Sequence, residues 1–517
     1  MNEKEEPMEL DRGLELLAKS SVIVFVGLLL SKILFYIYRF VIARSFGPEI
    51  YGVFSLAIAI FTIFTIFPLL GFDRGILRFV SFYQGGKDNR KIRYLFSFSK
   101  RFLLSSSILT AIILFLLADA ISLKIFHNPG LIFFLKVFSF VIPLYVFSTF
   151  YLSIIRASEK IFWYSFILNI LQNVLKLFSL VILIYLGFGL NSISYSYLLG
   201  ILGMFLVSYF FCRISFPTIF EKSNLKEKNK LDLRKSFLEY SWPLMFFGVI
   251  NILFFWVNSL LIGYFKGTYD VGLYNAAVPL AALLAFFPEL FIQLFFPLIN
   301  KEYSRKNILF IKELSKQLGK WIFLINLPLF IIIFFFPGAI INILFGKEYI
   351  VAANVLRILV VGEFVACLMV YICDNLMSMK GRSKLILMNI VFAVIFCSLL
   401  SIFLIPKYGI IGAAISVAIT QILLSIIFLI ETNYYLSIIP VKRKMLKIFF
   451  VSLIPMILLF YSRRIIPINT LSIILLGFLF LSLYLLLILT TKCLDKNDFE
   501  VLKSILNFKR FNHFFQS

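Results

Sequence analysis

Long runs of apolar residues constrain the fold of this chain more than any other feature. Residues 22–42 and 471–489 are two such runs, and each is long enough to cross a hydrocarbon core, which takes about 20 apolar residues per helix. Lipid offers no partner to backbone N–H and C=O groups, so each run must be helical. Hydrophobic residues make up 61% of the chain and the mean hydropathy is +0.98, which excludes the water-soluble classes.

We therefore expect an all-α polytopic membrane protein with about 14 transmembrane helices. The expected spans are 20–42, 50–71, 102–126, 131–156, 161–186, 191–213, 239–265, 271–299, 320–345, 351–379, 383–406, 409–431, 446–461 and 468–490. The thirteenth is short and contains Pro455. The first twelve spans are therefore better defined than the last two.

An internal repeat relates the two halves of the chain. Residues 47–57 read GPEIYGVFSLA and residues 267–277 read GTYDVGLYNAA, an offset of 220 positions. The same offset pairs Tyr151 with Tyr371, Ser158 with Ser378, Lys160 with Lys380 and Gly189 with Gly409. Each half holds six expected helices, and an even number makes the repeat parallel, which predicts two pseudo-symmetric six-helix lobes with a transport pathway between them.

The repeat also divides the chain into segments. We expect an N-terminal six-helix lobe at 1–213, a basic cytoplasmic linker at 214–238 and a C-terminal six-helix lobe at 239–431. A C-terminal helix pair, helices 13 and 14, occupies 432–490 outside the repeat, and a cytoplasmic tail follows at 491–517.

The net charge of +24 reports membrane topology. If the N-terminus is cytoplasmic, 38 of the 50 Lys and Arg residues fall on the cytoplasmic side and 7 on the outer side. This is the positive-inside distribution. It predicts a multi-pass protein of the cell (cytoplasmic) membrane with both termini in the cytoplasm, in contact with anionic membrane lipids. It argues against a nucleic-acid partner.

The sequence has no catalytic or metal-binding pattern. Its five cysteines lack zinc or CxxC spacing, and its two histidines lie in a loop and in the tail. We expect no metal site, no cofactor and no disulfide framework. No Ser/His/Asp set or phosphate-binding glycine loop is present either. The sequence therefore predicts a protein that is not an enzyme.

Ionisable residues inside apolar spans are the first candidates for function, because each costs several kcal/mol if it faces lipid. The cations are Lys32, Arg39, Lys136, Lys176 and Arg357. Lys32 and Arg39 lie seven residues apart, on one face of a helix. One interpretation is a cationic cavity that binds an anion such as phosphate. The alternative, for Arg39, Lys136 and Arg357 above all, is a side chain that snorkels to the interface.

Two further sets complete the candidate site. Asn169 and Asn173 form a polar stripe with Lys176 in the first half, and Asn251 and Asn258 are seven residues apart in the second. The intramembrane acids are Glu289, Glu363 and Asp374. The amides are interpreted as polar lining of a cavity. The acids either balance the cavity cations or bind a coupling proton or sodium ion.

Four motifs resemble one known family. Residues 43–52 (ARSFGPEIYG), 70–75 (LGFDRG), 344–349 (LFGKEY) and 404–414 (LIPKYGIIGAA) are similar to motifs of polysaccharide-biosynthesis and O-antigen repeat-unit flippases. These belong to the multidrug/oligosaccharidyl-lipid/polysaccharide (MOP, MATE-like) exporter superfamily. The resemblance covers about residues 15–431. It implies two six-helix lobes, often with an added helix pair.

The resemblance also implies a function: flipping of a polyprenyl-diphosphate-linked oligosaccharide from the cytoplasmic to the outer leaflet by alternating access, for surface polysaccharide or glycoconjugate biosynthesis. Its partners would be that lipid-linked glycan and, as a further expectation, glycan polymerases or ligases. Lys32 occupies a place where related lipid flippases often have a basic residue. Asn258 departs from relatives that carry an acid nearby, which puts ion coupling at that point in doubt.

Two other functions stay open from the sequence. One is a cation-coupled exporter of drugs or metabolites from the same superfamily, driven by protons or sodium. The other is a membrane enzyme or scaffold of glycan assembly. The buried charges favour the flippase, because five cations against three acids suit an anionic cargo.

Overall fold

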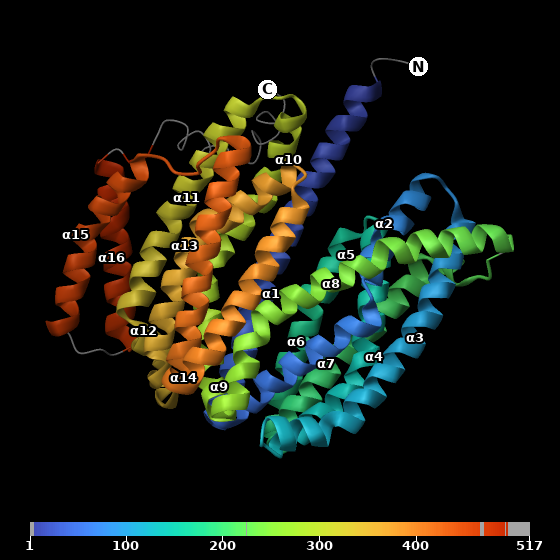
Figure 1. Ribbon diagram of the computed structural model, residues 1–517, viewed down its shortest axis with the longest axis horizontal. Helices are drawn as coiled ribbons and strands as arrows, with labels where there is room; N and C mark the ends of the chain where they lie inside the picture. The colour runs from blue at the N-terminus through green and yellow to red at the C-terminus, as the bar shows by residue number, and fades with distance from the viewer. Residues whose placement is uncertain (1–4, 224, 466–469, 492, 495–517) are drawn as a thin grey trace. The chain divides into compact units, whose positions relative to one another are not determined.

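Every element that the computed structural model describes is helical, as the apolar runs predict (Figure 1). The structure describes residues 5–223, 225–465, 470–491, 493 and 494. The helices are α1 (Glu5–Leu69), α2 (Phe72–Gly85), α3 (Asn89–Ala120), η1 (Ile121–Ile125), α4 (Gly130–Ala157), α5 (Ile161–Ser165), η2 (Phe166–Leu171), α6 (Gln172–Tyr185), α7 (Asn191–Ser215), η3 (Pro217–Phe220), α8 (Glu227–Lys266), α9 (Thr268–Ala281), η4 (Ala282–Ala285), α10 (Phe286–Ser304), α11 (Ile308–Phe335), α12 (Pro337–Leu344), η5 (Lys347–Ala352), α13 (Ala353–Met379), α14 (Ser383–Leu436), α15 (Lys444–Ile465) and α16 (Thr470–Thr490).

Eleven helices in the described part of the chain are long and apolar enough to cross a membrane. Two of them, Leu29–Leu69 and Ser383–Leu436, contain a non-helical glycine, at Gly47 and Gly409. A shorter apolar helix runs from Leu475 to Thr490. The protein is therefore a multi-pass membrane protein, and the count of about fourteen spans stays a prediction.

The chain folds into two compact units. Unit 2 comprises residues 22–276 and 390–416, and unit 1 takes the described residues within 1–21, 277–389 and 417–517. The division passes through α1, α9 and α14. The segment division expected from the sequence, 1–213, 214–238, 239–431 and 432–490, stays a prediction. The expected tail at 491–517 lies outside the described residues except for 491, 493 and 494.

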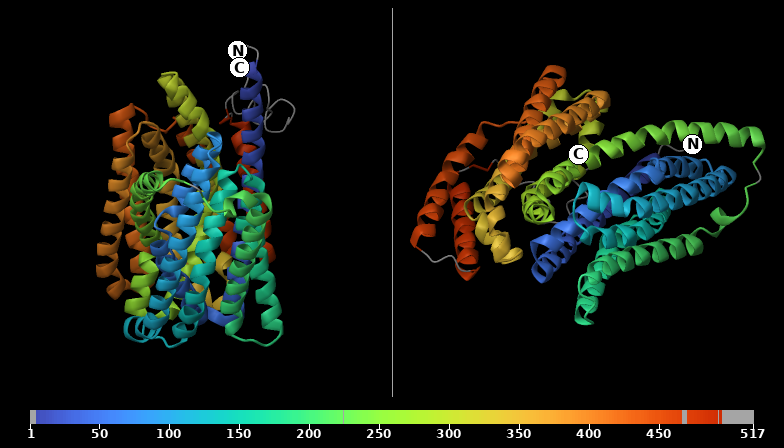
Figure 2. Two further views of the ribbon diagram at one scale, coloured as in Figure 1. Left: turned by 90° about the vertical axis from the view of Figure 1, so that its right-hand side faces the viewer. Right: turned by 60° about the horizontal axis from the view of Figure 1, so that its bottom comes forward.

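Unit 2 is built around α3, α4, α6 and α7, which pack side by side (Figures 1 and 2). Small residues permit the close approach: a Cβ on Gly200 of α7 would lie 2.3 Å from Cγ of Lys176 on α6. An aromatic core fills the interior, with Phe61 of α1 contacting Phe138 and Tyr145 of α4 and Tyr197 of α7. Buried aromatic area and this close packing hold the bundle together.

Unit 1 is built around α10, α11 and α13, which pack against one another, with α15 beside α11 and α16 beside α15. Tyr484 of α16 donates a hydrogen bond to the Leu324 carbonyl of α11 at 2.9 Å. A 3-10 turn, η4, interrupts the helix between α9 and α10. Asn326, fully buried on α11, donates to the Leu284 carbonyl in that turn at 3.0 Å. This side chain supplies a hydrogen-bond donor to a carbonyl group at the point where the helix is interrupted.

Candidate functional site

The polar stripe on helices α5–η2–α6 of unit 2 faces α1. A π-helical turn, η2 (Phe166–Leu171), lies in the middle of this membrane span, and such turns are frequent at functional sites. Asn173 Nδ2 donates to Ser31 Oγ of α1 at 3.1 Å and to the Asn169 carbonyl at 2.9 Å. Asn169 Nδ2 in turn donates to Ser165 Oγ at 3.1 Å. The structure therefore brings Asn169 and Asn173 together in one hydrogen-bonded seam.

Lys176 lies one turn farther along α6, inside the helix bundle. It is 8% exposed, and its Nζ lies 4.1 Å from the ring centroid of Tyr197 on α7. With the Gln172 amide turned so that both of its polar atoms are satisfied, its oxygen accepts from Lys176 Nζ at 2.7 Å. No ion pair of Lys176 occurs in the described part of the chain. Its charge is thus held by a π face and an amide, both neutral.

Lys32 and Arg39 lie on the same helix as Ser31 but in different surroundings. Lys32 is half-buried and directly follows Ser31, whose Oγ accepts from Asn173. Arg39 is 4% exposed, donates through Nη1 to Tyr51 Oη at 3.0 Å and stacks 4.6 Å from the Phe35 ring centroid. The Tyr51 hydroxyl then donates to the Asn275 carbonyl at 3.2 Å. Arg39 therefore links α1 to α9 within unit 2.

The two asparagines of α8 also differ. Asn251 is exposed, and its Nδ2 donates to the Phe247 carbonyl of its own helix at 2.7 Å. Asn258 is 2% exposed. Its Oδ1 accepts from Ser401 Oγ at 2.6 Å and its Nδ2 contacts Cys397 Sγ at 3.4 Å. Asn258 is satisfied by α14, whereas Asn251 keeps an accessible side chain.

Lys136 and Arg357 are held by local partners. Lys136 Nζ forms an ion pair with Asp119 at 3.1 Å, and both side chains are substantially exposed. Arg357 is half-buried and donates to the Phe334 carbonyl at 3.1 Å and to Asn354 Oδ1 at 3.0 Å. Neither residue belongs to the Lys176 cluster. Arg357 lies in unit 1, together with all three candidate acids.

The acids of unit 1 centre on Glu363 of α13. Its Oε2 accepts from Gln421 Nε2 of α14 at 2.6 Å, and Cys367 Sγ lies 3.9 Å from its Oε1. Glu289 of α10 is close enough to interact electrostatically with Glu363. Asp374 is half-buried three turns farther along α13. Glu289 and Glu363 thus lie on two helices, α10 and α13, that pack against each other.

Two polar contacts of these residues have little or no local signal in the sequence. Tyr197 meets Lys176, and Gln421 meets Glu363, because consecutive helices pack together, α7 on α6 and α14 on α13. Gln172, adjacent to Asn173, is visible in the sequence as a polar residue in an apolar run. Lys320, at the start of the expected span 320–345, is fully buried and was not among the candidate cations.

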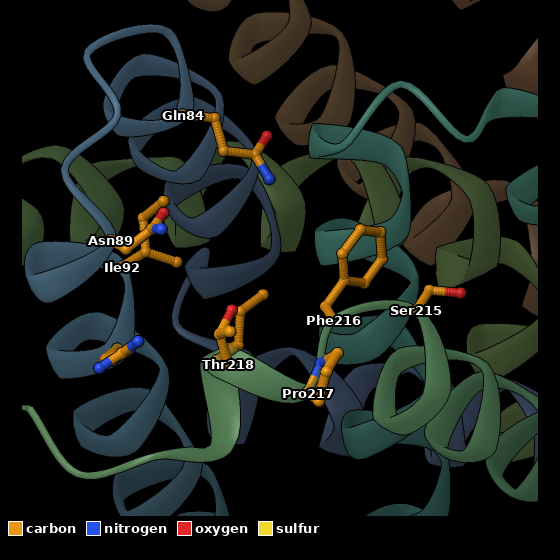
Figure 3. Close-up of a pocket in the computed structure, with 9 residues that line it drawn as sticks. Gln84, Asn89, Ile92, Ser215, Phe216, Pro217 and Thr218 are labelled. Carbon is orange, nitrogen blue, oxygen red and sulfur yellow. The ribbon is translucent and has the colours of Figure 1, made fainter.

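A hollow of about 250 Å³ lies in unit 2, where the end of α2 and the start of α3 meet the end of α7 and η3 (Figure 3). Gln84, Asn89, Phe216 and Thr218 line it, and Arg93 contributes to the lining as well. The Arg93 guanidinium already forms an ion pair with Glu221 at 2.8 Å. None of the candidate residues lines this hollow, so it is separate from the polar seam.

The chain is similar to known proteins in sequence and in fold. The chain is 26% identical over 398 residues to a putative O-antigen transporter of Shigella flexneri. The aligned region covers 74% of this chain and 89% of that protein. Its fold is similar to that of the lipid II flippase MurJ in an inward closed conformation, with a TM-score of 0.72 and 17% identity over 90% of this chain and 98% of MurJ. An inward-facing multidrug resistance MATE family transporter of the MOP superfamily gives a TM-score of 0.63 and 16% identity, over 81% of this chain and 98% of that one.

These likenesses confirm the MOP-type fold expected from the four motifs. Residues 41–354 also match the family model described as polysaccharide biosynthesis protein. This match covers more than half of the chain and includes the first three motifs as well as the glycine-rich start of the second repeat. The chain belongs to the polysaccharide biosynthesis protein family.

Proposed function

We propose that this protein flips a polyprenyl-diphosphate-linked oligosaccharide from the cytoplasmic to the outer leaflet by alternating access, for surface polysaccharide or glycoconjugate biosynthesis. It acts as a transporter and not as an enzyme. Family membership and the similarity to a putative O-antigen transporter support the class of cargo. The fold shared with a lipid II flippase supports the class of movement.

The observation that carries the proposal is the environment of Lys176. A buried ammonium group that is surrounded by a ring and an amide has its charge only partly compensated. A diphosphate supplies the missing negative charge through charge-assisted hydrogen bonds. We assign Lys176 and Lys32 to the diphosphate, and Asn169, Asn173 and Asn251 to the polar lining around it. Arg39, Lys136, Arg357 and Asn258 are assigned to holding the helices in place.

The orientation follows from the charge distribution. We place the protein in the cytoplasmic membrane with both termini and the basic loops on the cytoplasmic side. We assign the repeats to lobes at 1–213 and 239–431, with the linker 214–238 between them. Glycan polymerases or ligases, which use the flipped lipid, are proposed partners.

A second candidate function is a cation-coupled exporter. The acidic group of unit 1, Glu363 with Gln421 and the neighbouring Glu289, favours it, because carboxylates inside a membrane mark ion and proton pathways. In the flippase proposal the same acids balance the cavity cations. A flipping rate that is independent of sodium and pH supports the balancing role.

The test is translocation by the purified full chain in proteoliposomes. We expect flipping of a fluorescent polyprenyl-diphosphate oligosaccharide, inhibition by methylene diphosphonate on the cytoplasmic side, and no uptake of the cationic dye ethidium. A polyprenol-linked glycan without phosphate is the matched control and stays in its leaflet. Ethidium transport driven by a proton or sodium gradient, without glycolipid flipping, would replace the proposal with the exporter.

A further inference from the structure

The hollow of unit 2 has a polar and an apolar part. Arg93 is the charged residue among the described residues that line it, and none of these is an acid. Amides and hydroxyls of Gln84, Asn89, Ser215 and Thr218 supply the other polar groups, and the rest of the lining is apolar. A volume of about 250 Å³ is many times the space that one water molecule needs. This lining fits an anionic group that is attached to an apolar one.

The hydrogen bonding of Arg93 is incomplete. Its Nε is buried and has no hydrogen-bond partner among the described residues, and a buried donor in that state costs free energy. Its Nη2 is paired with Glu221, whose side chain is 56% exposed, so the pair adds little to stability. A phosphate group accepts from two guanidinium N–H groups at once. It can therefore replace the Glu221 carboxylate at little cost, while Ser223 Oγ still donates to the Arg90 carbonyl at 2.8 Å and keeps the linker beside α3.

Two neutral donors are available beside Arg93. Asn89 of α3 and Thr218 of η3 both line the hollow (Figure 3), and neither side chain forms a hydrogen bond with a residue that the structure describes. The wall itself is held in place, because Gln84 Nε2 donates to Ser158 Oγ at 2.8 Å. The donors thus surround a space that is already formed.

The surroundings of the hollow favour a lipid as the source of the anion. Phe82 on α2 is 73% exposed and Ile214 on α7 is 78% exposed, and each lies within two residues of a lining residue. Lys87, Arg90 and Lys222 are exposed on the same connections. Apolar side chains beside basic ones mark the level of the lipid headgroups, and basic pockets between membrane helices bind anionic headgroups.

We propose that this hollow binds the phosphate of an anionic glycerophospholipid, such as phosphatidylglycerol. Arg93, Asn89 and Thr218 donate to the phosphate oxygens, and the apolar lining contacts the glycerol end of the lipid. Glu221 pairs with Arg93 in the absence of the lipid and leaves when the lipid binds. The site is separate from Lys176 and does not depend on the proposed flipping.

Binding to the purified full chain in detergent tests the site. The probe is dioctanoyl phosphatidylglycerol, and the readouts are the Tm and displacement of a fluorescent phosphatidylglycerol. A ligand that binds the folded state raises the Tm in proportion to its occupancy. Zwitterionic dioctanoyl phosphatidylcholine and inorganic phosphate should protect far less. Equal protection by inorganic phosphate would assign the hollow to a free anion, and equal protection by phosphatidylcholine would remove the charge recognition; either result overturns the lipid site.

Two variants break the same ion pair and should act in opposite directions. Arg93→Gln should weaken phosphatidylglycerol binding roughly tenfold or more, because it removes a charge-assisted donor. Glu221→Gln should strengthen binding several-fold, because it removes the competing carboxylate and keeps Arg93. If both variants weaken binding equally, the ion pair only supports the fold, and the proposal fails.

Two further variants separate the hollow from general surface charge. Thr218→Val keeps the shape of the side chain and removes one donor, so binding should weaken several-fold with no change in charge. Lys222→Gln removes an exposed neighbouring cation and should leave the affinity close to wild type. A loss in Lys222→Gln as large as that in Arg93→Gln, or normal binding by Thr218→Val, would overturn the site. The Thr218 and Glu221 variants keep the test decisive if Arg93→Gln does not fold.

Discussion

The two units of the molecule hold their candidate charged side chains in different ways. Unit 2 holds Lys176 among neutral partners, whereas unit 1 holds Glu363 against the Gln421 amide. At the repeat offset of 220, Lys176 corresponds to Phe396, and Glu363 corresponds to Pro143. Neither charge has a counterpart in the other repeat. Duplication thus explains the helices that the two repeats share, whereas Lys176 and Glu363 each belong to one repeat alone.

The largest effect is expected from Lys176→Met, which keeps the length of the side chain and removes the charge. A hydrogen bond to a charged group contributes about 1.5–3 kcal/mol, so cargo flipping at low cargo concentration should fall roughly ten- to hundredfold. The Tm should stay the same or rise, because an apolar group in place of a buried charge is often neutral or stabilising. The measurements are flipping rates in proteoliposomes and thermal unfolding in detergent.

Lys176→Arg is the matched control, since it restores a cation that also binds phosphate. It should recover a substantial part of the flipping rate. A Lys176→Met protein that flips normally would remove the cation from the mechanism, and with it the contrast between the units. Loss of flipping together with a large drop in Tm would instead make Lys176 a structural residue.

A smaller effect is expected from Glu363→Gln in unit 1. The substitution keeps the shape of the side chain and an acceptor for the Gln421 amide. If the acids serve charge balance, flipping should change little at any pH or sodium concentration. The decisive comparison is the rate profile of wild type and variant across pH and sodium. Strong loss with a flattened profile would show that unit 1 couples an ion, and the two units would then divide cargo binding from energy input.

Residue type and position made one part of the site predictable. A lysine or glutamate in an apolar run stands out in the sequence because a lipid-facing charge is costly, so Lys176 and Glu363 are found without a structure. The helical fold follows from the same runs, and the Gly47-Pro48 pair predicts the break within α1. Apolar length alone leaves the number of spans as a prediction.

The residues that contact Lys176 and Glu363 could not be predicted from the sequence. Tyr197 reaches Lys176 because Gly200 lets α7 approach α6. Gln421, 58 residues farther along the chain than Glu363, reaches it from the next helix, α14. The π-helical turn before Gln172 has no recognised local pattern in this sequence. Arg39 and Asn258 are of the residue types that also line cavities, so the sequence does not separate the two roles. Only the structure shows that Arg39 donates a hydrogen bond to Tyr51 and that Asn258 accepts one from Ser401.

The smallest effect is expected from Lys136→Gln, on the same unit as Lys176. Its ion pair with Asp119 spans 3.1 Å between side chains that are 35% and 55% exposed, and such surface pairs contribute about 0–1 kcal/mol. Flipping and Tm should therefore stay close to wild type at both low and high salt. If Lys136→Gln instead lost as much flipping as Lys176→Met, exposure would not distinguish cargo-binding cations from structural ones. The anion site would then extend along unit 2 to Lys136, near the start of α4. Burial of the charge would no longer distinguish Lys176 from the other cations.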